Sequence, residues 1–494
     1  MLLFHRNTME STNRLRLKAP LIAQFEITPK CNNKCGFCYN FWEYDENSTL
    51  SRESNVDSKK IHGLMDVLLE NEVPAVCFTG GEPFLAGETL FELIGKAKSN
   101  GLYTSINSNG RLIREREAKR LKDLGLNSAL ISLHGDSPVY HEEAVGCSNA
   151  FEETLSGIEN LVNQGINVTV NYVSTQKNVD RIIPTAEMLK NLRVRNMTIT
   201  PLLPFAGVKD HEAWSMKKDQ FKQYFNSLVS AKESGLNVDS TLPVAPCILK
   251  DMFPEDYEKY LDVLSLRVCM AGVSFAVVSP EGINRACIQA PELEEYGDNI
   301  GKRFREGWKR ANDWSNLELI PQECSEQCYA LASCGGGCRT SSLAENGTVE
   351  GKTMYMGDPI SKEDASPFVK RMEVDVDRTL RTFRKRKGIK LRREEFGGVL
   401  VNARRQSFVI LDHEGTKAYE EIPDKFKVDY YDKGLATLYA SGMLHRSNGE
   451  DVPKYNQKMP IVHASRLFPR LAGSLPQDEK VRMLRADTGE RIYF

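Results

Sequence analysis

The chain reads IAQFEI at residues 22–27 and CNNKCGFC at residues 31–38. The first run is short and apolar, so it predicts a buried strand. Cys31, Cys35 and Cys38 follow directly. Thiolates are the usual protein ligands of iron–sulfur clusters, and a four-iron cluster held by three cysteines keeps one iron free to bind another ligand. The segment therefore predicts a cluster that takes part in chemistry, with a zinc knuckle or chance clustering as the alternatives.

A second motif lies at the end of the next expected strand. The apolar run VCFT at residues 76–79 leads into Gly80, Gly81, Glu82 and Pro83. Glycines at a strand end let the backbone approach a ligand closely, and a carboxylate beside them can accept hydrogen bonds from an ammonium group. Taken alone, the four residues fit an ordinary turn before a helix equally well.

The two motifs together resemble the radical S-adenosylmethionine (radical SAM) superfamily. In that family the open iron of a [4Fe-4S] cluster chelates the amino and carboxylate groups of SAM, an aromatic residue precedes the third cysteine, and a Gly-Gly-Glu motif holds the methionyl amine. The resemblance implies that the cluster ligands are Cys31, Cys35 and Cys38. It implies that SAM is contacted by Phe37, Gly80, Gly81 and Glu82.

The segment from residue 20 to 207 alternates two kinds of pattern. Strand-like runs lie at 22–27, 75–79, 102–107, 128–133, 167–173 and 197–201, and amphipathic runs lie at 59–70, 89–98, 114–124, 151–163 and 180–192. This alternation predicts an α/β fold with a parallel sheet and outer helices. Six such units make an open, TIM-like (β/α)6 barrel, which the resemblance also implies. Ligands are then expected at the carboxyl ends of the strands, where both motifs lie.

Polar residues end three of the later strands. By resemblance, Asn109, Ser132 and Asn171 are expected to contact the ribose or carboxylate of SAM. Each can instead form a turn or cap a helix. His134 follows the fourth strand, and we assign it no role.

Six further cysteines lie between residues 269 and 338. Four of them form the dense run Cys324-x3-Cys328-x5-Cys334-x3-Cys338, which encloses three consecutive glycines. Closely spaced cysteines indicate shared metals, and glycines let backbone amides turn toward sulfur. The region resembles the SPASM extension of radical SAM enzymes, which houses one or two auxiliary [4Fe-4S] clusters. Two structural zinc ions are the alternative.

The auxiliary region departs from the SPASM pattern in two respects. Its dense run opens with C-x3-C where C-x2-C is usual, and no cysteine follows Cys338. The resemblance assigns the first auxiliary cluster to Cys269, Cys287 and Cys338, with Cys247 as a candidate fourth ligand. It assigns the second to Cys324, Cys328 and Cys334, whose fourth ligand is an oxygen donor such as Asp358 or is absent. Cys77 and Cys147 are expected to be structural thiols.

Composition sets further limits. A chain of 494 residues exceeds a single core, so two or three domains are expected. No apolar run approaches the ~20 residues of a membrane span, and MLLF at the start is too short for a secretory signal. The net charge of −2 gives no field that attracts nucleic acid. Twelve cysteines at metal-ligand spacings indicate reduced thiolates in a cytoplasm, not disulfides.

The pattern changes after the cysteines. The pattern of residues 369–390 predicts a charged helix whose last part is the basic run RKRK at 384–387. Such a basic run is a solvated helix face more often than a nucleic-acid site. Runs at 398–402 and 407–412 predict a β-hairpin, followed by helices from His413 and over 434–444. This order resembles the peptide-binding RiPP recognition element of ribosomal peptide maturation. A capping or dimerisation domain is the alternative.

These patterns divide the chain into six parts: an N-terminal extension (1–19), a radical SAM core (20–215), a helical connector (216–264), a SPASM domain (265–365), a helix and basic linker (366–393) and a C-terminal α+β domain (394–494).

The expected function is that of a radical SAM/SPASM maturase. The resemblance implies that SAM is cleaved reductively to a 5′-deoxyadenosyl radical, which abstracts hydrogen from a peptide or protein that bears a leader. Crosslinking, thioether formation or backbone cleavage are the expected products, and flavodoxin or ferredoxin is the expected electron donor. Two alternatives stay open: a SPASM oxidase acting on a tetrapyrrole or sugar alcohol, and a non-catalytic iron–sulfur electron carrier.

Overall fold

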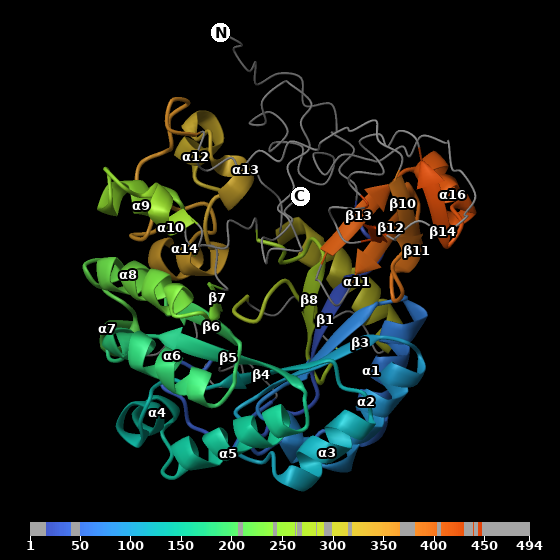
Figure 1. Ribbon diagram of the computed structural model, residues 1–494, viewed down its shortest axis with the longest axis horizontal. Helices are drawn as coiled ribbons and strands as arrows, with labels where there is room; N and C mark the ends of the chain where they lie inside the picture. Colours follow the sequence, from blue (N-terminus) through green and yellow to red (C-terminus); the bar gives the residue numbers. More distant parts are fainter. Residues whose placement is uncertain are drawn as a thin grey trace. The chain divides into compact units, whose positions relative to one another are not determined.

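A nine-stranded sheet organises the larger part of the chain in the computed structural model (Figure 1). The structure describes residues 16–40, 50–205, 211–240, 245–261, 263, 269–282, 284–290, 299–314, 319–365, 381–402, 407–428, 438 and 443–446. They fall into two compact units, residues 18–369 and a C-terminal unit that contains the described residues from Arg381 onward.

The strands of the large sheet follow the order β7-β6-β5-β4-β3-β2-β1-β8-β9. All neighbours from β7 to β8 are parallel, and β9 pairs antiparallel with β8. The predicted α/β fold with a parallel sheet is therefore confirmed, with the six expected strands present as β1 to β6. The bounds are β1 (Ile22–Glu26), β2 (Ala75–Thr79), β3 (Tyr103–Ser108), β4 (Ser128–Ser132), β5 (Asn167–Ser174), β6 (Asn196–Pro201), β7 (Asn237–Asp239), β8 (Phe275–Val278) and β9 (Asn284–Arg285).

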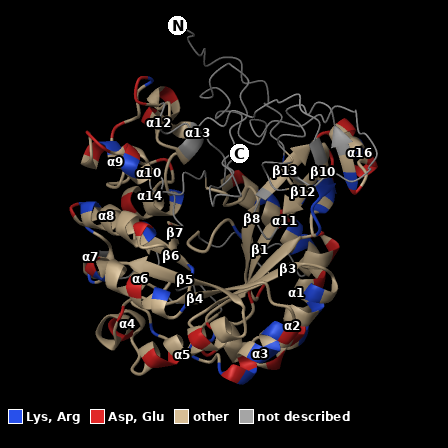
Figure 2. Cartoon of the chain, in the orientation of Figure 1, with Lys and Arg blue, Asp and Glu red and all other residues tan. Residues whose placement is uncertain are grey.

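Helices between the strands cover the outer side of the sheet. Figure 2 shows charged residues spread over these helices and few on the strands. The bounds are α1 (Ser58–Glu70), α2 (Glu88–Ser99), α3 (Glu115–Asp123), α4 (Pro138–Val145), α5 (Ala150–Asn163), α6 (Ile182–Asn191) and α8 (Gln220–Glu233), with 3₁₀ turns at Pro83–Ala86 and Val179–Arg181 and a short helix α7 (His211–Trp214).

Helix α1 illustrates how the sequence sets these elements. Its N-terminus is capped by Asp57, whose carboxylate accepts from the Lys59 amide at 2.9 Å. Ile61, Leu64 and Leu68 recur at helical spacing on one face and are buried. The apolar face packs under the sheet, and the polar face remains in solvent.

The strands alternate between two environments with a period of two. In β3, Thr104, Ile106 and Ser108 are buried, whereas Ser105 and Asn107 are half-buried. The buried set packs toward the outer helices, so the half-buried polar set lines the inner face of the sheet. The same alternation in β4 and β5 places Ser132, Thr169 and Asn171 on that inner face, together with the apolar Leu130 and Val173.

The cysteine-rich part continues the same unit. Strand β8 pairs with β1 in register Ile22↔Phe275, so it extends the barrel sheet directly. Fully buried Glu26 of β1 forms an ion pair with fully buried Arg285 of β9. The remaining helices of this unit are α9 (Cys247–Met252), α10 (Glu258–Leu261), α11 (Ile300–Trp314), α12 (Gln322–Gln327), α13 (Leu331–Cys334) and α14 (Arg339–Asn346).

The C-terminal unit contains two three-stranded sheets in its described residues, β14-β10-β15 and β11-β12-β13. Their strands are β10 (Arg381–Lys385), β11 (Lys390–Glu394), β12 (Gly397–Asn402), β13 (Ser407–Leu411), β14 (Lys425–Val428) and β15 (Leu444–Arg446), and the helix is α16 (His413–Glu421). The expected hairpin is confirmed as antiparallel β12 and β13, and the helix expected from His413 is confirmed as α16.

The helix expected over residues 369–390 is wrong for its described end. Residues 381–385 form β10, because Phe383 enters the buried core of this unit and pairs across the sheet with Phe426 of β14. A single aromatic residue in a charged run is compatible with the period of a helix and with that of a strand. Packing of Phe383 in the core favours the strand. Residues 366–380 lie outside the described residues, as does most of the helix expected over 434–444.

Candidate active site and auxiliary cysteine groups

The loop after β1 brings the three cysteines of the first motif together. Burial raises the pKa of the Cys31 thiol to about 12, and Glu82 and Cys38 add to that increase. Burial also raises the pKa of Cys35, which has both other cysteines as neighbours. Without metal these thiols keep their protons, and metal binding would displace them.

The Gly-Gly-Glu motif at the end of β2 holds this loop through backbone contacts. The amide of Gly81 donates to the Thr28 carbonyl at 2.7 Å, and the amide of Glu82 donates to the Lys30 carbonyl at 2.6 Å. A Cβ at Gly80 would lie 2.2 Å from the Thr28 carbonyl oxygen. Gly80 also has φ of +141°, which favours glycine. The glycines are therefore required for the loop to lie this close to β2.

The Glu82 carboxylate is fully buried below the cysteine loop. It accepts from the Ser108 hydroxyl and the Asn109 amide, both at 2.8 Å, and from the Phe84 amide at 3.2 Å. Burial raises the pKa of Glu82 to about 7, against these hydrogen bonds and nearby Arg111. An ammonium group placed here would favour the ionised carboxylate, so the site fits the amine of SAM.

Residues after β3 also hold the cysteine loop. Asn109 donates from Nδ2 to Asn32 Oδ1 at 2.6 Å, and Arg111 donates to Asn33 Oδ1 at 2.8 Å and to the Asn32 carbonyl at 2.7 Å. The sequence pointed to Asn109 as a SAM contact but gave no role to Arg111. Arg111 lies two residues past Asn109 in a turn. It forms an ion pair with Glu153 at 2.6 Å, and its charge also acts to lower the pKa of Glu82.

Phe37, expected to contact SAM, packs inward instead of standing free. Its ring makes edge contacts with His134 and Trp214, with centroids 5.2 and 5.5 Å apart. It is buried with Phe205 and Leu202. In the described structure Phe37 therefore anchors the turn that carries Cys38, and a contact with SAM stays a prediction.

Ser132, the last residue of β4, is the register partner of Asn171 within β5. Both are half-buried on the inner face, so both can reach a ligand there. His134, to which we gave no role, is buried: its Nδ1 accepts from the Val173 amide at 3.1 Å, and burial keeps its pKa well below the usual range. It stays neutral and supports the fold.

A first auxiliary group gathers Cys269, Cys287 and Cys338. Burial raises the pKa of Cys287 to about 12, and Cys269 and Cys338 are its next contributors. Arg339 is buried beside this group, and the Thr340 hydroxyl lies 3.1 Å from the Cys338 sulfur. These are the three cysteines that the SPASM resemblance groups together.

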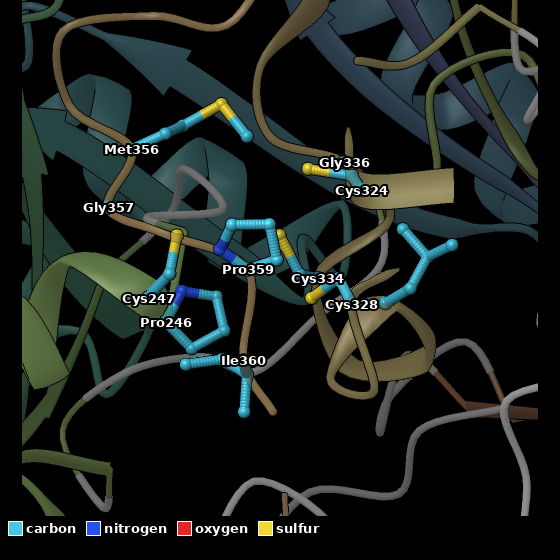
Figure 3. Close-up of a pocket in the computed structure, with 11 residues that line it drawn as sticks. Pro246, Cys247, Cys324, Cys328, Cys334, Gly336, Met356, Gly357, Pro359 and Ile360 are labelled. Carbon is cyan, nitrogen blue, oxygen red and sulfur yellow. The ribbon is translucent and has the colours of Figure 1, made fainter. Parts of the chain in front are cut away.

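A second auxiliary group contains four cysteines. Cys247, Cys324, Cys328 and Cys334 line one pocket together with Gly357 (Figure 3). Burial raises the pKa of Cys334, and Cys247, Cys324 and Cys328 raise it further. Cys247 thus lies with the second group, whereas the sequence placed it with the first. Linear spacing gave no sign of this, because Cys247 precedes both groups by more than twenty residues of chain.

Asp358 does not lie where a fourth ligand is needed. Its side chain is fully exposed, and its carboxylate is 3.6 Å from Lys352 Nζ. The backbone of its neighbour Gly357 packs on Cys247, where an added Cβ would be 2.7 Å from the Cys247 carbonyl oxygen. This packing leaves Asp358 directed to solvent, which differs from the expected position beside the cluster.

Among the described residues, no three His, Cys, Asp or Glu side chains are gathered closely enough to hold a single metal ion. Thiolates are the usual protein ligands of iron–sulfur clusters, so the donor atoms of the three cysteine groups fit such clusters. In the described part of the chain no helix combines the length and apolar character that a membrane span requires.

Comparison with known proteins agrees with this geometry. Residues 25–189 match the model of the radical SAM superfamily. The chain carries a radical SAM domain. Such a domain binds a [4Fe-4S] cluster and SAM, so the chain is an enzyme that uses both cofactors.

The matches to two curated relatives extend over most of each relative's length. The AdoMet-dependent heme synthase of Oleidesulfovibrio alaskensis is 26% identical over 358 residues, which cover 70% of this chain and 89% of the relative. The PqqA peptide cyclase of Gluconobacter oxydans is 24% identical, covering 73% of this chain and 95% of the relative. These two relatives act on different kinds of substrate.

Solved structures share the fold. SuiB of Streptococcus suis bound to S-adenosylmethionine has a TM-score of 0.53 and 17% identity, covering 69% of this chain and 78% of SuiB. SuiB has also been solved bound to its precursor peptide SuiA, with a TM-score of 0.52 to this chain. At this identity the likeness establishes the fold alone.

Proposed function

We propose that this enzyme is a radical SAM maturase that removes hydrogen from a peptide or protein and holds auxiliary clusters of the SPASM type. Bound SAM, after one-electron reduction, supplies a 5′-deoxyadenosyl radical. We propose flavodoxin or ferredoxin as the electron donor and a cytoplasmic location, because free thiolates persist in reducing compartments. The leader-binding role of the C-terminal unit belongs to the same proposal.

The chain's own residues have distinct roles in this proposal. Cys31, Cys35 and Cys38 hold the cluster. Glu82 receives the SAM ammonium group in a site from which water is excluded, where a charge-assisted hydrogen bond is strong. Ser132 and Asn171 orient the ribose or the carboxylate from the inner face.

The inner face of the sheet is the observation that carries the choice of substrate. Strands β1 to β6, as described, contain no lysine or arginine. Arg285 of strand β9 is fully buried and paired with Glu26 of β1. Tetrapyrroles carry several carboxylates, and such a substrate calls for cations. A peptide backbone instead needs neutral donors and acceptors, which this face supplies.

One inner-face residue has an unused hydrogen-bonding group. Gln24 of β1 is buried, and its Nε2 has no partner among the described residues. The second carboxylate oxygen of Glu26, two residues along the same face, is also without one. A buried polar group without a partner costs about 1–3 kcal/mol. A substrate that offers amide groups would satisfy both.

A tetrapyrrole oxidase is the second candidate, and the heme synthase relative favours it. Anaerobically reconstituted enzyme should therefore be assayed for 5′-deoxyadenosine with candidate precursor peptides and with iron coproporphyrin III. We expect a mass change in a peptide and no change in the porphyrin. Decarboxylated porphyrin would refute the peptide proposal. The variant with Cys31, Cys35 and Cys38 all replaced by Ala is the control, and it should make no 5′-deoxyadenosine.

A further inference from the structure

Four thiols from two distant parts of the chain face one pocket. Cys247 is the first residue of α9, and Cys324, Cys328 and Cys334 belong to α12, its C-cap and α13. Figure 3 shows Cys247 on one side of this pocket and Cys328 and Cys334 on the other. Four thiolates are the usual complement of a closed four-iron cluster.

We propose that Cys247 is the fourth thiolate of the cluster held by Cys324, Cys328 and Cys334, so that this cluster has no open iron.

Contacts around α9 fix Cys247 in this position. The segment after Met356 packs on the first turn of α9, with Gly357 at the closest approach. Gly357 and Cys247 both line the pocket that the four thiols face. Lys250 of α9 also forms an ion pair with Asp364, which ties the helix to the chain beyond Ile360.

Two other candidates for the fourth ligand are less suitable. Asp358 is exposed and paired with Lys352. Met356 lines the pocket, but its thioether is a neutral, weaker donor than a thiolate. Cys247 is the thiol that the described structure places with the other three.

The proposal also changes which auxiliary cluster is expected to have an iron without a thiolate ligand. All twelve cysteines are described, and each belongs to a group or to a site of its own. Cys77 bonds to Asn107 inside the barrel, and Cys147 lies by the Asn32 carbonyl. Cys269, Cys287 and Cys338 therefore have no fourth thiol. An auxiliary iron open to substrate or solvent is expected in that group, and none in the Cys247 group.

The test uses the full chain with Cys31, Cys35 and Cys38 replaced by Ala, so that auxiliary clusters are observed alone. Mild oxidation removes the iron that lacks a thiolate and leaves a [3Fe-4S] cluster, which EPR counts per chain. One such signal is expected from the Cys269 group. Adding Cys247→Ala should raise the signal about twofold, because a second cluster then has an open iron. The matched changes Asp358→Ala and Met356→Leu should leave it unchanged.

A second measurement needs no variant at Cys247 and so does not depend on its folding. Alkylation followed by mass spectrometry should show Cys247 protected by iron loading together with Cys324, Cys328 and Cys334. Cys77 and Cys147 should react equally with and without iron. Equal labelling of Cys247 in loaded and apo protein, an unchanged EPR signal in Cys247→Ala, or one zinc in place of iron at this site would each overturn the proposal.

The inference rests on the auxiliary clusters of the proposed function, and the iron content of the triple variant separates the two. If that variant binds no iron, both are refuted. If it binds iron that neither protects Cys247 nor responds to Cys247→Ala, the inference alone is refuted, and the proposed function stands.

Discussion

Gly81→Ala should lower 5′-deoxyadenosine formation about 100-fold. The added Cβ would lie 2.2 Å from the Lys30 carbonyl oxygen and 2.5 Å from that of Pro29, whereas ordinary contact begins at 3.4 Å. Lys30 would have to retreat by more than about 1 Å, and it immediately precedes Cys31. A displacement of about 1 Å at a reacting centre costs about 10²-fold in rate. The hydrogen bond from the Glu82 amide to Lys30 would also break.

The assay measures 5′-deoxyadenosine from anaerobically reconstituted protein with dithionite and saturating SAM, alongside iron content. Gly95→Ala is the matched control. Gly95 lies within α2 of the same βα unit, and its Cβ would meet only Leu124 at 3.6 Å. That variant should keep full activity and gain up to about 1 kcal/mol of helix stability. Activity of Gly81→Ala within about threefold of the parent would refute the view that this backbone contact positions the cluster loop.

Three further outcomes are expected. Arg285→Met should lower the free energy of unfolding by about 3–5 kcal/mol, because it leaves the Glu26 charge buried alone, and the double variant with Glu26→Gln should recover most of it in denaturant melts. SAM affinity measured by calorimetry should fall about tenfold between pH 8 and pH 6, because the Glu82 carboxyl, whose pKa is about 7, becomes protonated and loses its attraction for the ammonium group. Glu82→Gln should abolish this pH dependence, and a pH dependence that persists in the variant contradicts the assignment. Ending the chain at residue 369, the boundary of the large unit, should weaken leader-peptide binding far more than it slows uncoupled SAM cleavage. The reason is that the removed strands β11 and β13 are the outer strands of their sheet and are available for β-augmentation. Equal peptide affinity of the truncated and full chains in fluorescence anisotropy would argue against leader binding.

The sequence was sufficient for the elements with a regular pattern. The six strands β1 to β6 follow short apolar or alternating runs, and the helices α1, α2, α3, α5 and α6 follow amphipathic runs, so these elements could be predicted. Helix α4 was missed because its apolar residues do not gather on one face. The strands β7, β8 and β9 were missed because they are at most four residues long. Strands β7 and β8 form by pairing with β6 and β1, which are distant in the chain, whereas β9 pairs with the nearby β8. The segment around Phe383 was predicted as a helix for a different reason. One aromatic residue in a charged run fits a helix and a strand equally well, and only its packing in the core determines which forms.

The site was predictable where ligands are close in sequence. Cys31, Cys35 and Cys38, and the glycines that hold their loop, stand in short motifs with a clear chemical reason. Cys247 was predicted beside Cys269, Cys287 and Cys338 but lines the pocket of the other group of thiols. Its place depends on how α9 packs against Gly357, which cannot be read from the spacing of the cysteines. Asp358 looked like a ligand by its position in the chain, yet Lys352 is its partner in solvent. Arg111 had no motif to mark it.

The pairing of β8 with β1 bears on how far the enzyme is modular. Strand β1 lies between β2 and β8, so the cysteine-rich segment supplies one of its two neighbours. A fragment that ended before β8 would expose the whole edge of β1, the strand that leads into the cluster loop, and such edges template aggregation. The same fragment would leave Glu26 without Arg285. The auxiliary segment is therefore not an exchangeable appendage, and chimeras with other barrels should be joined after β9.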